Sequence, residues 1–110
     1  MEIRENDKIY IIAPLSAKID RRKAERLIKE IDQESRLVAL DLSNVEECSI
    51  DFIEAIKSLV NKNLSIFNIQ SDIFVLFNFM NVDKMAKLFV SENDFLQDTR
   101  QLINRSFKLV

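Results

Sequence analysis

Residues 41 to 51 hold a group of carboxylates and hydroxyls whose types could support chemistry. The carboxylates and hydroxyls belong to Asp41, Glu46, Glu47 and Asp51, and to Ser43 and Ser49. Carboxylates that converge on one point can bind a divalent cation or transfer protons, and a serine in a loop can accept a phosphoryl group. A solvated acidic loop explains the same carboxylates without any site, so we expect no metal centre here.

The amino-acid composition excludes most other routes to catalysis. The chain of 110 residues contains no histidine, which excludes Ser/His/Asp and Cys/His catalysis and also zinc sites that use histidine. It contains no glycine either, so no loop can bring its backbone close around a phosphate as nucleotide-binding proteins do. We therefore expect a protein that is not an enzyme and that has no cofactor.

Size and charge indicate one folded domain over residues 1–110. Hydrophobic residues make up 47% of the chain and charged residues 31%, with a net charge of -2, so the chain can bury a core and keep a polar surface. The longest apolar runs, such as residues 9–15, are far shorter than the roughly 20 residues of a membrane-spanning helix. A polar start and a single cysteine, Cys48, which we expect to be a small buried hydrophobe, favour the cytoplasm. The slight negative charge disfavours nucleic acid as a partner.

The first half of the chain predicts a hairpin, a helix and a buried strand. Residues 1–5 and 8–17 are typical of strands and flank a polar turn. Asp20 can cap a helix over residues 21–33, where apolar side chains recur at helical spacing. Residues 37–42 form a short continuous apolar run, which is typical of a central strand covered on both faces.

The second half continues the alternation of strands and helices. Residues 51–61 and 72–81 are typical of helices, and residues 64–68 and 87–91 are typical of strands. The tail predicts an amphipathic helix with a stripe of Leu96, Thr99, Leu102, Ile103 and Phe107. This alternation indicates an α/β fold in which some strands pair in parallel.

One segment of the sequence is similar to a known family. The order Asp41-Leu42-Ser43-Asn44-Val45 and the residues that follow as far as Ile53 resemble the STAS domain of anti-sigma factor antagonists, closely in the first half and with substitutions in the second. Residues 17–27 and 82–89 support the alignment, so the resemblance covers nearly the whole chain. It implies an α/β fold with a mixed sheet of four to five strands and about four helices packed mainly on one side.

The resemblance also implies a role for Asp51. In family members that act as phosphorylation switches, the second helix begins with the motif Asp-Ser-Ser/Thr-Gly. A partner anti-sigma kinase phosphorylates the second hydroxyl residue of this motif, and the complex with the partner then dissociates. The matching residue here is Asp51, so we do not expect phosphorylation there. Two interpretations stay open: Asp51 resembles a permanently modified site with about -1 charge, or it caps the helix in a capping box with Glu54.

The sequence and the resemblance together predict a non-enzymatic bacterial regulatory domain that binds another protein, either an anti-sigma factor or a similar switch kinase. The residues expected to form the switch loop and to contact the partner are Ser43, Asn44, Ser49, Ile50, Asp51 and Phe52. An alternative is the cytoplasmic STAS accessory subunit of a membrane lipid transporter. The alignment gives no support for phosphorylation of Ser43 or Ser49, and this question stays open together with the partner's identity and the oligomeric state.

A second candidate interface lies in residues 73–82, where only two side chains are polar. The apolar stripe that would anchor a surface helix consists of Ile73, Leu76, Phe77 and Met80. Phe74, Val75 and Phe79 fall outside this stripe, so we expect them to form a face that contacts another chain. A homodimer is one outcome, and the alternative is that the C-terminal helix covers the three side chains.

Arg21, Arg22 and Lys23 form a basic cluster in the first turn of the helix predicted over residues 21–33. The helix dipole favours acidic residues in this turn, so local helix energetics do not explain the cluster. It either attracts an acidic partner or is a solvated face that the fold tolerates at a cost of a few tenths of a kcal/mol.

Overall fold

The computed structural model of the protein describes residues 1–59 and 62–99, and its first two strands form the predicted hairpin. β1 (Glu2–Glu5) pairs antiparallel with β2 (Ile9–Ala13). The side-chain oxygen of Asn6 accepts hydrogen bonds from the backbone N–H groups of Lys8 and Ile9, each at 2.8 Å. These bonds close the turn between the two strands, because an asparagine side chain can take the place of a backbone acceptor there.

Five strands form one mixed sheet in the order β1-β2-β4-β6-β7. β4 (Leu37–Asp41) lies in the middle and pairs in parallel with β2 on one side and β6 (Leu64–Phe67) on the other. β7 (Lys87–Leu88) adds in parallel to β6. The position of β4 confirms the central strand predicted from its continuous apolar run. β3 (Lys18–Ile19) and β5 (Glu47–Cys48) form a separate two-stranded parallel sheet.

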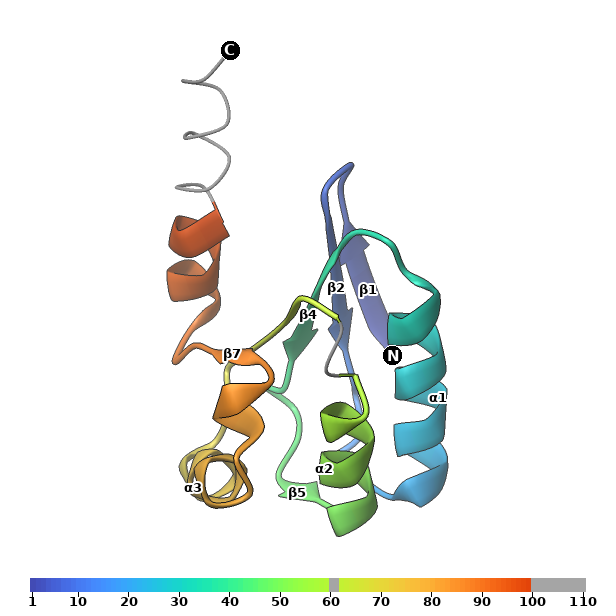
Figure 1. Cartoon of the computed structure of the whole chain (residues 1–110), viewed down its shortest axis with the longest axis vertical. Helices are drawn as coiled ribbons and strands as arrows, with labels where there is room; N and C mark the ends of the chain where they lie inside the picture. Colours follow the sequence, from blue (N-terminus) through green and yellow to red (C-terminus); the bar gives the residue numbers. More distant parts are fainter. Residues whose placement is uncertain (60–61, 100–110) are drawn as a thin grey trace.

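Three helices pack on one side of the sheet. They are α1 (Arg21–Gln33), α2 (Ile50–Lys57) and α3 (Ser71–Phe79). Figure 1 shows α1 and α2 side by side next to the strands, with α3 farther along the same end of the molecule. Apolar side chains of all three helices pack in the main core against alternate residues of the strands, such as Ile12, Leu40 and Ile66. Asp20 caps α1 as predicted, accepting a hydrogen bond from the Lys23 N–H at 2.9 Å.

A fourth helix, which includes residues 92–99, packs on the opposite face of the sheet. Its Phe95 is almost completely buried and stacks on Phe67 of β6 with 5.3 Å between the ring centroids. The Phe89 ring contacts the Phe95 ring edge to face at 5.8 Å. A smaller second core therefore lies on this side of the sheet.

The predicted fold class is confirmed: a mixed sheet of five strands with helices mainly on one side. The predicted tail helix is present at Leu96 and Thr99. The rest of its predicted stripe, at Leu102, Ile103 and Phe107, lies outside the described residues. Over residues 1–59 and 62–99, no helix has the length and hydrophobicity needed to cross a membrane.

Arg4 connects the first strand to the centre of the sheet and to the last described helix. Its guanidinium donates to Oδ2 of Asp41 at 3.0 Å and to both carboxylate oxygens of Glu92 at 3.0 and 2.6 Å. The other oxygen of Asp41 accepts hydrogen bonds from the Ser43 N–H at 3.0 Å and from the Asn68 side chain at 3.1 Å. The buried carboxylate at the end of β4 is thus fully engaged in holding the fold together.

Two asparagines take left-handed backbone conformations in this chain without glycine. Asn68 has φ 56° after β6, and Asn81 has φ 64° after α3. Asparagine is among the few residues that adopt this region at low cost, because its short side chain can hydrogen-bond locally. The left-handed turn at Asn81 follows directly on the end of α3, which is shorter than the helix predicted over residues 72–81.

Candidate functional site

The loop between β4 and α2 holds the residues that the sequence singles out, and it is anchored at several points. Val45 is completely buried beneath it. The Glu47 N–H donates to the carbonyl oxygen of Ala17 at 3.0 Å, and the Ser49 N–H donates to that of Ile19 at 3.1 Å. The short sheet of β3 and β5 therefore holds this loop in one conformation.

The pairing of β3 with β5 is the part of the site that sequence analysis missed. Each strand has only two residues, which is too short for the alternation of apolar and polar side chains to predict a strand. The remaining signal is the exposed Lys18 before the buried Ile19, matched by the exposed Glu47 before the half-buried Cys48. Such a pattern becomes informative only when the two segments are known to be adjacent.

α2 begins one residue earlier than predicted, and this changes the role of Asp51. The Ser49 hydroxyl accepts a hydrogen bond from the Phe52 N–H at 3.1 Å and so caps the helix. Asp51 lies within the first turn, and its side chain is exposed. The prediction that Asp51 caps the helix is therefore wrong. Its carboxylate still interacts favourably with the positive end of the helix dipole.

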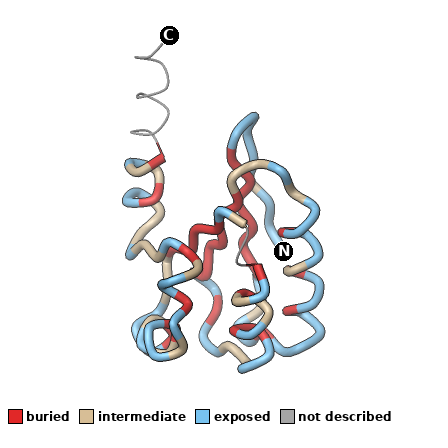
Figure 2. Tube along the Cα trace, viewed as in Figure 1, coloured by how far each residue is buried: buried red, intermediate tan, exposed pale blue. Residues whose placement is uncertain are grey.

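The structure places the predicted contact residues at three different depths. Those presented to solvent are Ser43, Asn44, Ile50 and Asp51. The Ser49 side chain is half-buried, and its oxygen is engaged as the helix cap. Phe52 is completely buried, so it supports the start of α2 from the core and cannot contact a partner as predicted. In Figure 2 the end of the molecule that carries β5 and the start of α2, at the bottom of the view, is largely exposed around a buried interior.

The carboxylates of the loop do not form a metal centre in the part of the chain that the structure describes. No group of three or more Cys, Asp or Glu side chains that could hold a metal ion occurs there. Asp41 already accepts hydrogen bonds from Arg4, Ser43 and Asn68. The other carboxylates of the loop, those of Glu46, Glu47 and Asp51, are exposed and can contact another molecule.

A groove of about 270 Å³ lies between the loop and α3. Its exposed acidic residues are Glu46, Glu47 and Asp72. Its apolar residues, which are half-buried or buried, are Cys48, Ile73 and Leu76. Burial raises the pKa of the Cys48 thiol to about 12, and the negative charge of Asp72 adds to this shift. Cys48 is therefore a neutral part of the apolar floor, because only a thiolate is a strong nucleophile.

One side of α3 continues the groove with an apolar face. Asp72 and Leu76 line the groove, and Val75 and Phe79 lie on the same side of the helix because they follow at spacings of three and four residues. Val75 is 67% exposed and Phe79 is 83% exposed. Large apolar side chains with this exposure, next to one another and beside a groove, are typical of a contact surface.

Phe74 does not belong to this face, contrary to the prediction that groups it with Val75 and Phe79. Its side chain is half-buried and lines a different groove together with Phe89. The predicted alternative, in which the C-terminal helix covers the three side chains, does not hold for Val75 and Phe79, which residues 92–99 leave exposed. Those residues pack through Phe95 on the opposite face of the sheet, although their Asp98 lines the same groove as Phe74.

We call the exposed loop residues and the exposed side of α3 together the loop–α3 surface. It consists of Ser43, Asn44, Glu46, Glu47, Ile50, Asp51, Asp72, Val75, Leu76 and Phe79. Four of these residues carry a carboxylate and none carries a positive charge. Apolar side chains surrounded by acidic ones suit the non-covalent binding of a protein whose own contact surface is apolar and basic.

The basic cluster at the start of α1 contributes no residue to the loop–α3 surface. Arg21 pairs with Glu25 one turn later at 3.3 Å, and both side chains are well exposed. The Lys23 ammonium donates to the carbonyl oxygen of Lys18 at 3.4 Å. The cluster is therefore partly balanced by its own helix and by the strand before it.

Comparisons with known proteins bear on the fold of the chain. No family model matches the sequence, and no curated protein sequence matches it. The crystal structure of TM1081 from Thermotoga maritima, described as a "putative anti-sigma factor antagonist", superimposes with a TM-score of 0.74 over 90% of this chain and 93% of that chain, at 14% identity. The NMR structure of TM1081 gives a TM-score of 0.73 over 89% of this chain and 86% of that chain, at 15% identity. The chain therefore has the STAS-like fold of that protein.

Proposed function

We propose that this chain is a non-enzymatic regulatory domain that binds an anti-sigma factor or a similar switch protein through the loop–α3 surface. The STAS-like fold shared with TM1081 supports this proposal at the level of architecture. The observation that carries it is the groove between Glu47 and Asp72, which joins the loop to the exposed side of α3. The function places the chain in the bacterial cytoplasm.

Exposed apolar side chains would supply most of the binding energy. Ile50 is 57% exposed at the start of α2, and Val75 and Phe79 extend from α3. Burying a phenylalanine fully contributes about 1.5 to 3 kcal/mol, so Phe79 and Ile50 together could sustain a moderate affinity. Such anchors work best when polar residues around them exclude water, and the acidic residues of the groove have that position.

Several contacts restrain the loop before the partner arrives, and such restraint lowers the entropy cost of binding. The Ser49 cap, the pairing of β3 with β5 and the buried Val45 and Phe52 all fix it from below. A rigid loop suits a partner that recognises the shape and charge of the surface.

Asp51 supplies a fixed negative charge within this surface. The resemblance puts it where the switch proteins carry their phosphorylated hydroxyl, and its carboxylate is exposed near the N-terminus of α2, where the helix dipole favours a negative charge. We infer that the partner carries a basic group opposite Asp51. Binding is then not regulated by phosphorylation at this residue.

Affinity purification from the native bacterium, followed by mass spectrometry, tests the proposal. The baits are the wild-type chain, Ile50→Ser and Phe79→Ser, with Val90→Ser as the matched control. Val90 is 78% exposed and lies outside the loop–α3 surface. Removing an exposed apolar side chain should leave the fold unchanged in all three variants, which circular dichroism can check.

The expected result is an anti-sigma factor or switch kinase that is recovered with the wild-type chain and Val90→Ser but is depleted with Ile50→Ser and Phe79→Ser. Recovery of a transporter ATPase subunit instead would favour the accessory-subunit function. Equal recovery of the same partner with all four baits would refute the assignment of the loop–α3 surface.

A further inference from the structure

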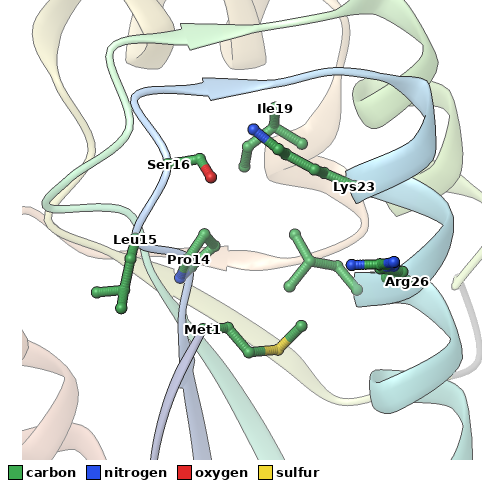
Figure 3. A pocket seen from close by; sticks show the side chains of 8 residues that line it. Met1, Pro14, Leu15, Ser16, Ile19, Lys23 and Arg26 are labelled. Atoms are coloured by element: carbon green, nitrogen blue, oxygen red, sulfur yellow. The ribbon is translucent and has the colours of Figure 1, made fainter.

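A small cavity lies between the end of β2 and α1 and shares no residue with the loop–α3 surface. Its volume is about 150 Å³, the size of a protein cavity that holds one benzene molecule. Ile19 and Leu27 line it and are almost completely buried, so this wall is fixed by the core. Pro14 and Met1 lie across the opening from α1 (Figure 3). The cavity therefore has room for one apolar group of about six carbon atoms.

Two cations line this cavity, and no acidic side chain does. Lys23 and Arg26 contribute to it from α1, and Figure 3 shows the Lys23 side chain extending from the helix in the direction of Ser16. Within the described residues, the Arg26 side chain makes no hydrogen bond or ion pair. The Lys23 ammonium donates to the carbonyl oxygen of Lys18 at 3.4 Å and also interacts electrostatically with Asp20. The charge of Arg26 is thus available to a ligand, and that of Lys23 is only partly balanced.

The acidic residues near the two cations each have a partner of their own. Asp20 accepts a hydrogen bond from the backbone N–H of Lys23 at 2.9 Å and also interacts electrostatically with the ammonium of that residue, and Glu25 pairs with Arg21 at 3.3 Å. Lys23 and Arg26 are three residues apart on α1, and Figure 3 shows the Lys23 side chain extending away from Arg26. An anion at the opening of the cavity can therefore pair with the Arg26 guanidinium and also be attracted by the positive charge of Lys23.

We propose that the cavity binds a small monocarboxylic acid, with its apolar tail inside and its carboxylate paired with Arg26 and attracted by the positive charge of Lys23. The guanidinium presents two parallel N–H groups that match the two oxygens of a carboxylate, and the ammonium adds a second positive charge. The hydroxyl of Ser16, which also lines the cavity, supplies a further donor. The same chemistry occurs in a free carboxylic acid and at the C-terminus of a polypeptide that ends in an apolar residue.

Amide NMR of the isotope-labelled full chain tests the proposal with four probes. These are hexanoate, its neutral analogue hexanamide, acetate, which lacks the tail, and the peptide N-acetyl-Gly-Phe with a free carboxylate. Hexanoate should shift the amide signals of Ser16, Ile19 and Leu27 in a saturable way. It should bind about tenfold more tightly than hexanamide, which lacks the negative charge of the carboxylate, and than acetate, which lacks the apolar tail. Tighter binding of the peptide than of hexanoate would identify a polypeptide end as the source, and the reverse would identify a free acid.

Variants separate the cavity from the general positive charge of α1. Lys23→Gln and Arg26→Gln should each weaken hexanoate binding about fivefold, whereas Lys29→Gln, on the same helix but outside the cavity, should leave it unchanged. Ser16→Phe should abolish binding by filling the cavity while both cations remain. Equal affinity for hexanoate and hexanamide, or equal weakening by Lys29→Gln and Arg26→Gln, would overturn the proposal even if Ser16→Phe did not fold.

Discussion

The hydroxyl oxygen of Ser49 accepts a hydrogen bond from the backbone N–H of Phe52 at 3.1 Å. This contact caps the first turn of α2. In the same turn the Phe52 ring packs in the core and is completely buried, whereas Asp51 is exposed. The first turn of α2 therefore offers Asp51 to a partner and keeps Phe52 out of its reach.

Replacing Ser49 with Ala should lower the free energy of unfolding by about 1 kcal/mol, because the Phe52 N–H loses its acceptor. Ser49→Asp should largely keep the stability, since aspartate is an equally good cap. Asp51→Ala should cost less than about 0.5 kcal/mol, because the exposed carboxylate contributes only its interaction with the helix dipole. Urea denaturation measures all three, and a larger loss for Asp51→Ala than for Ser49→Ala would contradict the assignment of the cap.

The error over this cap shows where sequence reasoning reaches its limit. Ser49 and Asp51 are both favoured cap residues, and a helix boundary inferred from apolar spacing is uncertain by one or two residues. The observed helix begins at Ile50, so Ser49 is its cap and Asp51 lies inside the first turn. Local patterns of this kind predict that a helix exists more reliably than they predict which residue begins it.

Strong local signals did predict most of the architecture. The continuous apolar run of β4 and the Asp20 cap of α1 are both confirmed. The groove beside the loop could not be predicted, because it depends on the position of α3 relative to Cys48 and on the two-residue pairing of β3 with β5. These are long-range contacts, and no periodicity in the sequence encodes them.

Arg4→Met should lower the free energy of unfolding by about 2 kcal/mol, because the buried Asp41 carboxylate loses its cation. Glu92→Gln should cost less than about 1 kcal/mol, since the Glu92 side chain is partly exposed and its amide oxygen can still accept a hydrogen bond from Arg4. Urea denaturation measures both.

The double variant Arg4→Met/Asp41→Asn provides the control for this ion pair. It should be more stable than Arg4→Met alone, because the uncompensated charge is gone. If the second substitution lowers the stability further, the ion pair between Arg4 and Asp41 does not have the role given to it here.

The stability of the fold should depend on alkaline pH through Cys48. Its pKa is raised from 9.0 to about 12 in the folded chain, so the folded state favours the neutral thiol. The contribution of this group to stability is fully present below pH 9.0 and is lost as the pH rises toward about 12. Cys48→Ala should remove this part of the alkaline loss in urea melts recorded across the same range.

Chemical labelling gives an independent check on the cause of this shift. Cys48 should react slowly with a thiol reagent near neutral pH, and Asp72→Asn should speed the reaction because a nearby negative charge has been removed. Asp83→Asn is the matched control and should leave the rate unchanged. Equal rates for Asp72→Asn and the wild-type chain would show that the charge of Asp72 does not reach the thiol.

Asp51→Ser should weaken binding of the captured partner about fivefold at low salt, because an attraction to a basic group is lost. Raising the ionic strength should reduce this difference, since salt screens exposed charges. Asp94→Ser, which removes an exposed acid from the first turn of another helix, serves as the control for net charge. A gain in affinity with Asp51→Ser would instead identify Asp51 as a mimic of the phosphorylated state that releases the partner.

Hydrogen exchange of the chain alone and in complex with the captured partner shows whether the partner binds the loop–α3 surface, because it locates the contact without any substitution. We expect slower exchange on binding in the segments 43–52 and 71–79, which carry the loop–α3 surface, and unchanged exchange in β1 and in residues 92–99. Protection confined to β1 or to residues 92–99, with no change in the loop or α3, would contradict it.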